Sequence, residues 1–81
     1  AGNSGSMCKT ITHPGELEFV ATVGNVDKNH IIRFSSSRGP VTDGRKKPDL
    51  VAPGTDIYST IHISPFFGLK TGTSQAAPHL A

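Results

Sequence analysis

Ser74 stands in a setting that suits covalent chemistry. It lies in the stretch GTSQAAPHLA, where good helix formers follow it directly. Pro78 is tolerated in the first turn of a helix, where its missing N–H has no partner to lose. The pattern predicts a helix that begins close to Ser74 and holds Pro78 in its first turn. The serine hydroxyl then lies beside unpaired backbone N–H groups, where it is either a helix cap or a nucleophile that needs a neighbouring base.

The rest of the chain reads as strands and loops around this helix start. Apolar and small residues between turn formers predict strands over residues 19–25 and 29–37. Residues 50–61 are expected to form two short extended pieces that Pro53 and Gly54 separate, and residues 38–49 a surface loop. Strands followed by a helix favour the α/β class.

Composition points to a piece of a larger domain. The chain has 81 residues, of which 35% are hydrophobic, and it contains nine Gly, six Pro and no Trp. A chain of this length buries only about 60% of the surface that its unfolded form exposes. We therefore expect a fragment cut at both ends, which packs against a neighbouring segment.

Several classes of function are not supported by the sequence. The net charge is +2, and the only basic cluster, Arg45 to Lys47, is predicted to be a solvated turn, so we expect no nucleic-acid partner. A single cysteine, Cys8, excludes an internal disulfide. No apolar run reaches the roughly 18 residues of a membrane span. The spacing of His, Asp and Glu matches no metal motif.

Five stretches, in the right order, resemble the subtilisin-like serine proteases: AGNSG, ATVGNVD, FSSSRGP, KPDLVAPGTDIYST and the closing GTSQAAPHLA. The resemblance covers essentially the whole chain. It implies that residues 1–81 are a carboxy-proximal part of the catalytic domain, from the oxyanion asparagine segment to the start of the nucleophile helix. It also implies the family's three-layer fold, a parallel sheet between helices.

The resemblance assigns roles to individual residues. Ser74 matches the nucleophile, and Asn3 matches the side-chain donor to the oxyanion, with the Ser74 backbone N–H as the second donor. "GNSG" by itself would also fit an ordinary turn residue. Substrate-binding roles fall on the residues that flank these two or wall the pocket before the scissile bond: Ala1, Gly2, Thr12, Gly72 and Thr73. The peptide bond before Pro14 is cis in the family.

Two departures from the family pattern bear on activity. Gln75 replaces the usual methionine after the nucleophile, which removes an oxidisable side chain and places an amide near the oxyanion. The Asp and His of the triad precede the serine in this family, in motifs that residues 1–81 do not contain. None of His13, His30, His62 and His79 is expected to be the base. We therefore expect the remainder of the protease domain to supply both groups.

The resemblance has further implications. Substrates would be proteins or peptides, no cofactor is expected within this chain, and structural calcium belongs to the parent family. The family is often secreted. Two alternatives remain open: a catalytically inert fragment that associates through open sheet edges, and a pseudo-enzyme that keeps the fold as a binding module.

Overall fold

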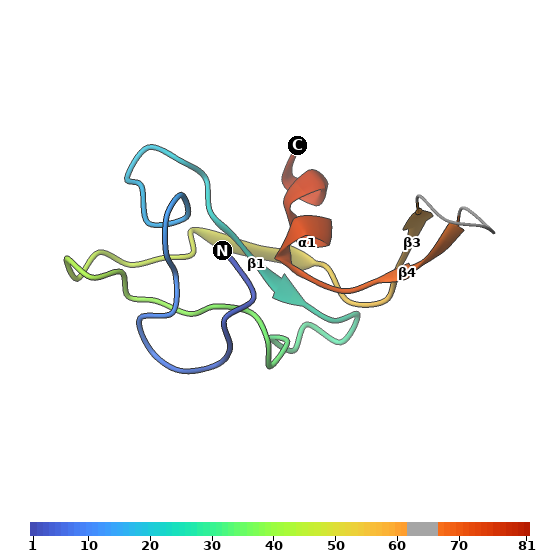
Figure 1. Cartoon of the computed structure of the whole chain (residues 1–81), viewed down its shortest axis with the longest axis horizontal. Coiled ribbons are helices and arrows are strands. Elements are labelled where there is room, and N and C mark those ends of the chain that lie inside the picture. Colours follow the sequence, from blue (N-terminus) through green and yellow to red (C-terminus); the bar gives the residue numbers. More distant parts are fainter. Residues whose placement is uncertain (62–66) are drawn as a thin grey trace.

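The computed structural model describes residues 1–61 and 67–81. In these residues the strands β1 (Val23–Val26), β2 (Leu50–Pro53), β3 (Ile57–Thr60) and β4 (Phe67–Lys70) precede one helix, α1 (Thr73–Leu80). Figure 1 shows α1 beside the β1–β2 pair, with the β3–β4 pair at one end of the molecule. The expected α/β arrangement is confirmed, with a parallel pair of strands and a helix against it. The described residues form no second helical layer.

The parallel pair β1–β2 is the base on which α1 rests. Val23 lies opposite Leu50, and Val26 opposite Pro53. Every residue of β1 is buried, as its two valines favour. Val23, Ala52 of β2 and Ala76 of α1 form one buried cluster. Because two of these side chains are only methyl groups, the helix can lie close to the sheet.

The strand expected over residues 19–25 begins later, at Val23. The Thr22 N–H donates to Asp49 Oδ2 at 2.8 Å, and the Thr22 hydroxyl donates to the Gly15 carbonyl at 2.7 Å. These groups take the bonds that a neighbouring strand would otherwise form. Phe19 is 95% exposed and has no face of a sheet to join. The prediction is therefore wrong for residues 19–22.

The strand expected over residues 29–37 is not formed. One isolated antiparallel bridge joins Ile32 to Val26. Asp27 Oδ1 accepts the N–H groups of Asn29 at 2.8 Å and Ile31 at 3.0 Å, which folds the chain into a tight loop after β1. An aspartate that captures backbone donors in this way competes with strand pairing.

Residues 38–49 contain no helix, and only Asp49 precedes a strand directly, so the predicted loop is confirmed. The prediction of a solvated basic turn is wrong for Lys47. Its ammonium group is buried and donates to Asp49 Oδ2 at 2.8 Å and to the Val20 carbonyl at 2.7 Å. Lys47 thus fastens the loop to the segment before β1.

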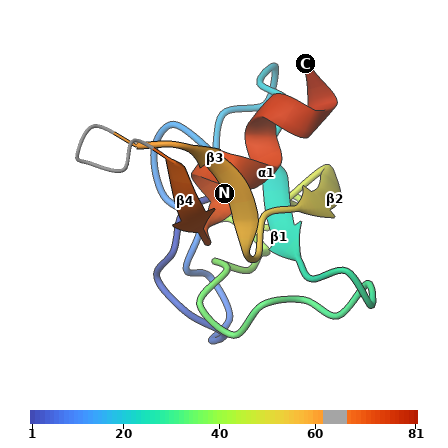
Figure 2. The same ribbon diagram turned by 90° about the vertical axis from the view of Figure 1, so that its right-hand side faces the viewer.

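Residues 50–61 form the two expected extended pieces, β2 and β3. Strand β4 was not predicted, because Gly68 and Lys70 weaken the strand pattern. β3 pairs with it antiparallel, Ile57 opposite Lys70 and Thr60 opposite Phe67. In Figure 2 this pair faces the viewer. In the part of the chain that the structure describes, no helix is long and apolar enough to cross a membrane.

The helix begins where it was predicted, with Gly72 as its N-cap and Thr73 as its first residue. Pro78 is the sixth helical residue, so the prediction that it lies in the first turn is wrong. At this position proline has no N–H to donate to the Ser74 carbonyl. Pro78 therefore removes one bond from the second turn of a helix that is only eight residues long.

Candidate active site

Ser74 is the second residue of α1, and its side chain is exposed. The first-turn N–H groups of Gln75 and Ala76 donate to the Gly72 carbonyl at 3.1 and 3.3 Å. The N–H of Ser74 has no acceptor among residues 1–61 and 67–81. A free donor therefore lies beside the hydroxyl of the same residue, at the positive end of the helix.

Asn3 is held against the start of α1 by bonds that cross almost the whole sequence. Its Oδ1 accepts the Thr73 N–H at 3.0 Å, 70 positions away, and the Thr73 hydroxyl at 3.3 Å. The Thr73 hydroxyl in turn accepts the Gly2 N–H at 3.1 Å. Because Oδ1 is occupied, the amide is oriented and Nδ2 is left as its donor. Thr73 itself is buried and faces Asn3.

Gly72 is the point where three segments meet. Its N–H donates to the Gly54 carbonyl at 2.7 Å. A Cβ atom at this position would lie 3.1 Å from Gln75 Oε1 and 3.2 Å from Asn3 Nδ2. A side chain would therefore displace one of the two amides. The absence of a side chain lets the carboxamides of Asn3 and Gln75 lie close to the same point.

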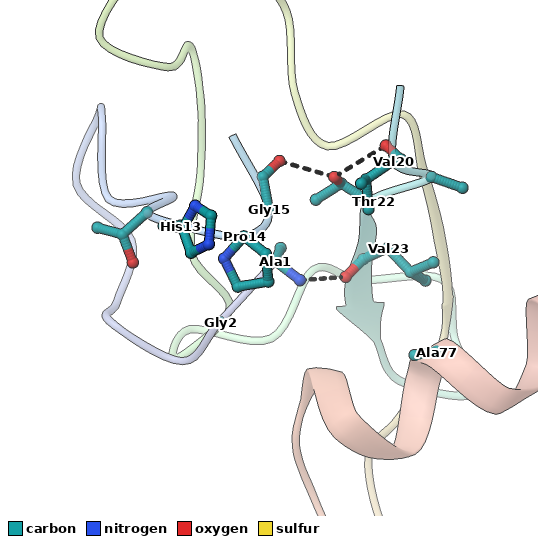
Figure 3. Close-up of a pocket in the computed structure, with 11 residues that line it drawn as sticks. Ala1, Gly2, His13, Pro14, Gly15, Val20, Thr22, Val23 and Ala77 are labelled. Carbon is teal, nitrogen blue, oxygen red and sulfur yellow. Dashed lines mark hydrogen bonds between the residues drawn. The ribbon is translucent and has the colours of Figure 1, made fainter. Parts of the chain in front are cut away.

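A pocket of about 220 Å³ opens beside this site (Figure 3). Three of the residues predicted to bind substrate line it: Ala1, Gly2 and Thr12. The other lining residues come from the turn around Pro14, the segment that enters β1 and α1: His13, Pro14, Gly15, Val20, Ala21, Thr22, Val23 and Ala77. Ser74 is not part of the lining. The peptide bond between His13 and Pro14 is cis, as the resemblance implied.

The amino group of Ala1 is part of the pocket wall. It donates to the Val23 carbonyl at 2.9 Å, which ties residue 1 to the edge of β1 (Figure 3). The wall nearest Asn3 is thus fixed to the same strand on which α1 packs.

No described histidine or carboxylate bonds to Ser74. His79 Nδ1 lies 2.9 Å from the Gln75 carbonyl within α1, and His13 lies in the pocket wall. Asp43 is in the distant loop, where hydrogen bonds from Arg45 hold the pKa of its carboxyl below the usual range. His62 lies outside the described residues. What the structure brings together is therefore Ser74, its free N–H and the amide of Asn3, which are the groups predicted to be the nucleophile and the oxyanion donors.

Asn25, which was not predicted from the sequence to have a role, packs against the loop after β2 that holds Gly72. It is 0% exposed in the middle of β1, and its Oδ1 accepts the Thr55 hydroxyl at 3.2 Å. A Cβ atom on Gly54 would lie 2.7 Å from Asn25 Oδ1 and 2.5 Å from the Gly72 carbonyl. Asn25 is therefore packed under the loop that holds Gly72. A polar residue inside the apolar run VGNV was the available signal.

Comparisons with known proteins agree with this geometry. A model of the subtilase family matches residues 1–81. Serine protease AprX of Bacillus subtilis is 46% identical over 66 residues, 73% of this chain and 15% of that protein. Subtilisin-like protease 10 of Trichophyton verrucosum is 44% identical over 81 residues, all of this chain and 15% of that protein. The aligned part of the chain thus spans 15% of the length of each of these two relatives.

A solved structure is also similar. The CspB protease of Clostridium perfringens superposes with a TM-score of 0.80 at 40% identity, over 93% of this chain and 16% of that one. The arrangement of β1, β2 and α1 is therefore found in a protease of known structure.

Proposed function

Because the chain belongs to the subtilase family, we propose that it is part of a serine endopeptidase that cleaves peptide bonds through an acyl-enzyme on Ser74. One observation carries the proposal. The amide of Asn3, oriented by Thr73, and the free N–H of Ser74 both lie at the start of α1. Two such donors are what a developing oxyanion requires.

In this mechanism Ser74 Oγ forms a bond to the carbonyl carbon of the scissile peptide. The negative charge that develops on the carbonyl oxygen is bound by Asn3 Nδ2 and the Ser74 N–H, and the helix start favours it. The Ser74 proton passes to a histidine and then to the leaving amine as the C–N bond breaks. Water then hydrolyses the ester, which releases the acid product and restores the serine.

The substrate-binding roles rest on the same neighbourhood. Ala1, Gly2 and Thr12 line the 220 Å³ pocket and would receive the side chain before the scissile bond. Gly72 would let the substrate backbone approach the nucleophile. Thr73 acts through Asn3, because its hydroxyl and N–H both donate to that side chain.

The base must come from elsewhere, and we propose that it is supplied by a segment outside residues 1–81. That segment would carry the Asp and His of the triad, so the 81-residue chain alone would be inactive. No group of three or more His, Cys, Asp or Glu side chains within the described ranges could hold a metal ion. Structural calcium is therefore proposed only for the parent protease and is assigned to no residue of this chain. Secretion is proposed on family membership alone.

A second candidate is an inert fragment or pseudo-enzyme that acts by association. The exposure of large apolar side chains favours it, above all Phe19 at 95% and Phe34 at 77%. Large exposed apolar side chains are typical of a surface that binds another protein surface. If the chain is part of an endopeptidase, the remainder of the protease domain would cover this surface. If the chain is an inert fragment or pseudo-enzyme, a second copy of the chain would cover it.

Fluorophosphonate labelling tests the proposal, because the reagent reacts only with an activated serine. The complete protease that contains residues 1–81 should be labelled at Ser74, as mapped by mass spectrometry, and the Ser74→Ala variant should not. The isolated chain should stay unlabelled while its circular dichroism shows it to be folded. Light scattering of the isolated chain would reveal self-association.

A folded complete protease that is unlabelled at Ser74 would contradict the endopeptidase and favour the pseudo-enzyme. Labelling of the isolated chain would contradict the claim that the base lies outside it.

A further inference from the structure

A second cavity, of about 640 Å³, lies at the other end of β1 from the pocket near Ala1. Its walls are the loops that follow the two parallel strands, and Figure 1 shows both loops on the side of the molecule that carries the β3–β4 pair. The lining residues are Asp27, Lys28, Asn29, Arg33, Pro53, Thr55, Asp56 and Ile57. Crevices at the carboxyl ends of parallel strands are where open α/β sheets bind ligands.

Both walls are held in place by hydrogen bonds. The Arg33 N–H donates to the Asn25 carbonyl at 2.9 Å, and the Arg33 carbonyl accepts the Ser36 N–H at 3.0 Å. On the opposite wall the Asp56 N–H donates to Thr71 Oγ1 at 2.9 Å. The backbone that carries the charged side chains is therefore fixed to β1 and to the segment before α1.

The carboxylates and the cationic side chains of the cavity differ in how many hydrogen-bond partners they have. Asp27 Oδ1 already accepts two backbone N–H groups, and Asp56 Oδ1 lies 3.5 Å from the Thr71 hydroxyl. Lys28 and Arg33 have no side-chain partner within residues 1–61 and 67–81. One oxygen of each carboxylate is thus engaged, whereas neither cationic side chain has a partner in the described residues. An incoming carboxylate is thus the ligand that these groups are best placed to bind.

Two hydrogen bonds link the wall of the cavity to the segment just before Ser74. Thr71, which holds Asp56, is three residues before Ser74, and the Gly54 carbonyl beside the cavity accepts the Gly72 N–H at 2.7 Å. The pocket near Ala1 lies at the opposite end of β1. If the residue before the scissile bond enters that pocket, the chain after the bond leaves toward this cavity.

We infer that this cavity is a substrate subsite that binds an acidic side chain, Glu or Asp, downstream of the scissile bond, with Arg33 and Lys28 as specificity-determining residues. The inference rests on the proposed endopeptidase function. An extended peptide advances about 3.3 Å per residue, so the acidic residue is sought among the first few positions after the bond.

The test uses the complete protease that contains residues 1–81 and pairs of quenched fluorescent peptides with amidated C-termini. Within a pair, one residue among the first four after the scissile bond is Glu or Gln, and mass spectrometry of the products confirms the bond that is cut. We expect the Glu peptide to have the higher kcat/KM at one position. Arg33→Gln should lower the Glu-to-Gln ratio about 2- to 5-fold, as befits an exposed charge pair.

The double variant Arg33→Gln, Lys28→Gln should bring the ratio close to unity, and high salt should weaken the wild-type preference. The matched control, Lys46→Gln, removes an exposed cation from the loop at the far end of the molecule and should leave the ratio unchanged (Figure 1). The Gln peptides should be cleaved equally well by all four proteins.

Cleavage without a Glu preference at any of the four positions, or a preference that survives the double variant, would overturn the inference and leave the endopeptidase intact. Absence of cleavage together with an unlabelled Ser74 would overturn both.

Discussion

The start of α1 and the β3–β4 pair lie next to each other in the chain, yet they are built in opposite ways. Thr73 is buried and bonded to Asn3 from the far end of the sequence. The β3–β4 pair is held by its own ladder and by the stacked rings of Tyr58 and Phe67, 5.9 Å apart. Tyr58 is 71% exposed. The first region obtains its geometry from long-range contacts and the second from its immediate neighbours.

This difference indicates where function demands precision. The donor that we propose for the oxyanion would lose much of its effect if it were misplaced by about 1 Å, and the bonds from Thr73 fix its position. A two-stranded ribbon is marginally stable by itself and tolerates small changes of shape. Substitutions in the two regions should therefore have very different consequences.

The largest effect is expected for Asn3→Ala in the complete protease. It removes the side-chain donor and should lower kcat about 10²- to 10³-fold with little change in KM, the loss established for such an asparagine in a subtilisin. Steady-state kinetics on a peptide substrate would measure it. Thr42→Ala, in the exposed loop of residues 38–49, is the control and should leave kcat within twofold of wild type. A loss that appears in KM instead would contradict the oxyanion role.

Gln75→Glu should have the next largest effect. Gln75 Oε1 and Asn3 Nδ2 approach the same point above Gly72, so a carboxylate there would oppose the oxyanion. We expect kcat to fall about tenfold at pH 8. Because a glutamate is neutral below its pKa of about 4.3, the deficit relative to wild type should shrink as the pH falls toward that value.

Gln75→Met is the matched control, since it removes the amide without adding charge. It should keep most of kcat but become sensitive to peroxide. A deficit for Gln75→Glu that is constant across the pH range would show that the substitution acts through packing.

A smaller effect, on stability, is expected at Asp49, directly before β2 and outside both regions. Hydrogen bonds from Lys47, and then from the Thr22 N–H, hold the pKa of its carboxyl below the usual range of an aspartate. A group whose pKa is depressed on folding stabilises the native state above its unfolded pKa of about 3.9, and this stabilisation is lost as the pH falls through the folded value. Asp49→Asn should lower the midpoint of thermal unfolding at pH 7 and flatten its decline below pH 4.

Calorimetry of the complete domain from pH 7 to pH 2.5 would measure both changes. Asp43→Asn is the matched control, because Asp43 pairs with Arg45 at the exposed tip of the loop, where solvent screens the pair, and it should change the acid limb less than Asp49→Asn does. If the unfolding midpoint of Asp49→Asn falls below pH 4 as steeply as that of the wild type, this account is contradicted.

The sequence predicted the two regions unequally well. The start of α1 followed from the helix formers after Ser74, and β2 and β3 from apolar pieces around Pro53 and Gly54. Contacts between distant positions were not predictable in this way. The bond from Thr73 to Asn3 spans 70 positions, and only the resemblance to the family suggested that the two are neighbours.

The errors have a common physical cause. Thr22 and residues 29–37 carry strand-forming side chains, but carboxylates of Asp49 and Asp27 take the backbone N–H groups that strands would use. Lys47 was expected in solvent and is buried by the same Asp49. Propensity describes which backbone shape a residue favours, whereas these outcomes depend on where one carboxylate directs its bonds: Asp27 bonds within its own loop, and Asp49 reaches Thr22 across 27 positions.

The smallest effect is expected in the β3–β4 pair. Tyr58→Ala removes the stacked ring, and pairs of this kind contribute about 0.5–1.5 kcal/mol beyond the area that they bury. Tyr58→Leu keeps apolar area without the ring and should recover part of the loss, which urea unfolding of the complete domain would measure. Because β4 leads into Thr71 and Gly72, kcat for a peptide substrate is the more telling measurement. If the bonds of Asn3 and Gly54 alone hold the start of α1, kcat should stay within about twofold of wild type, whereas a tenfold loss would show that the ribbon also sets the position of Ser74.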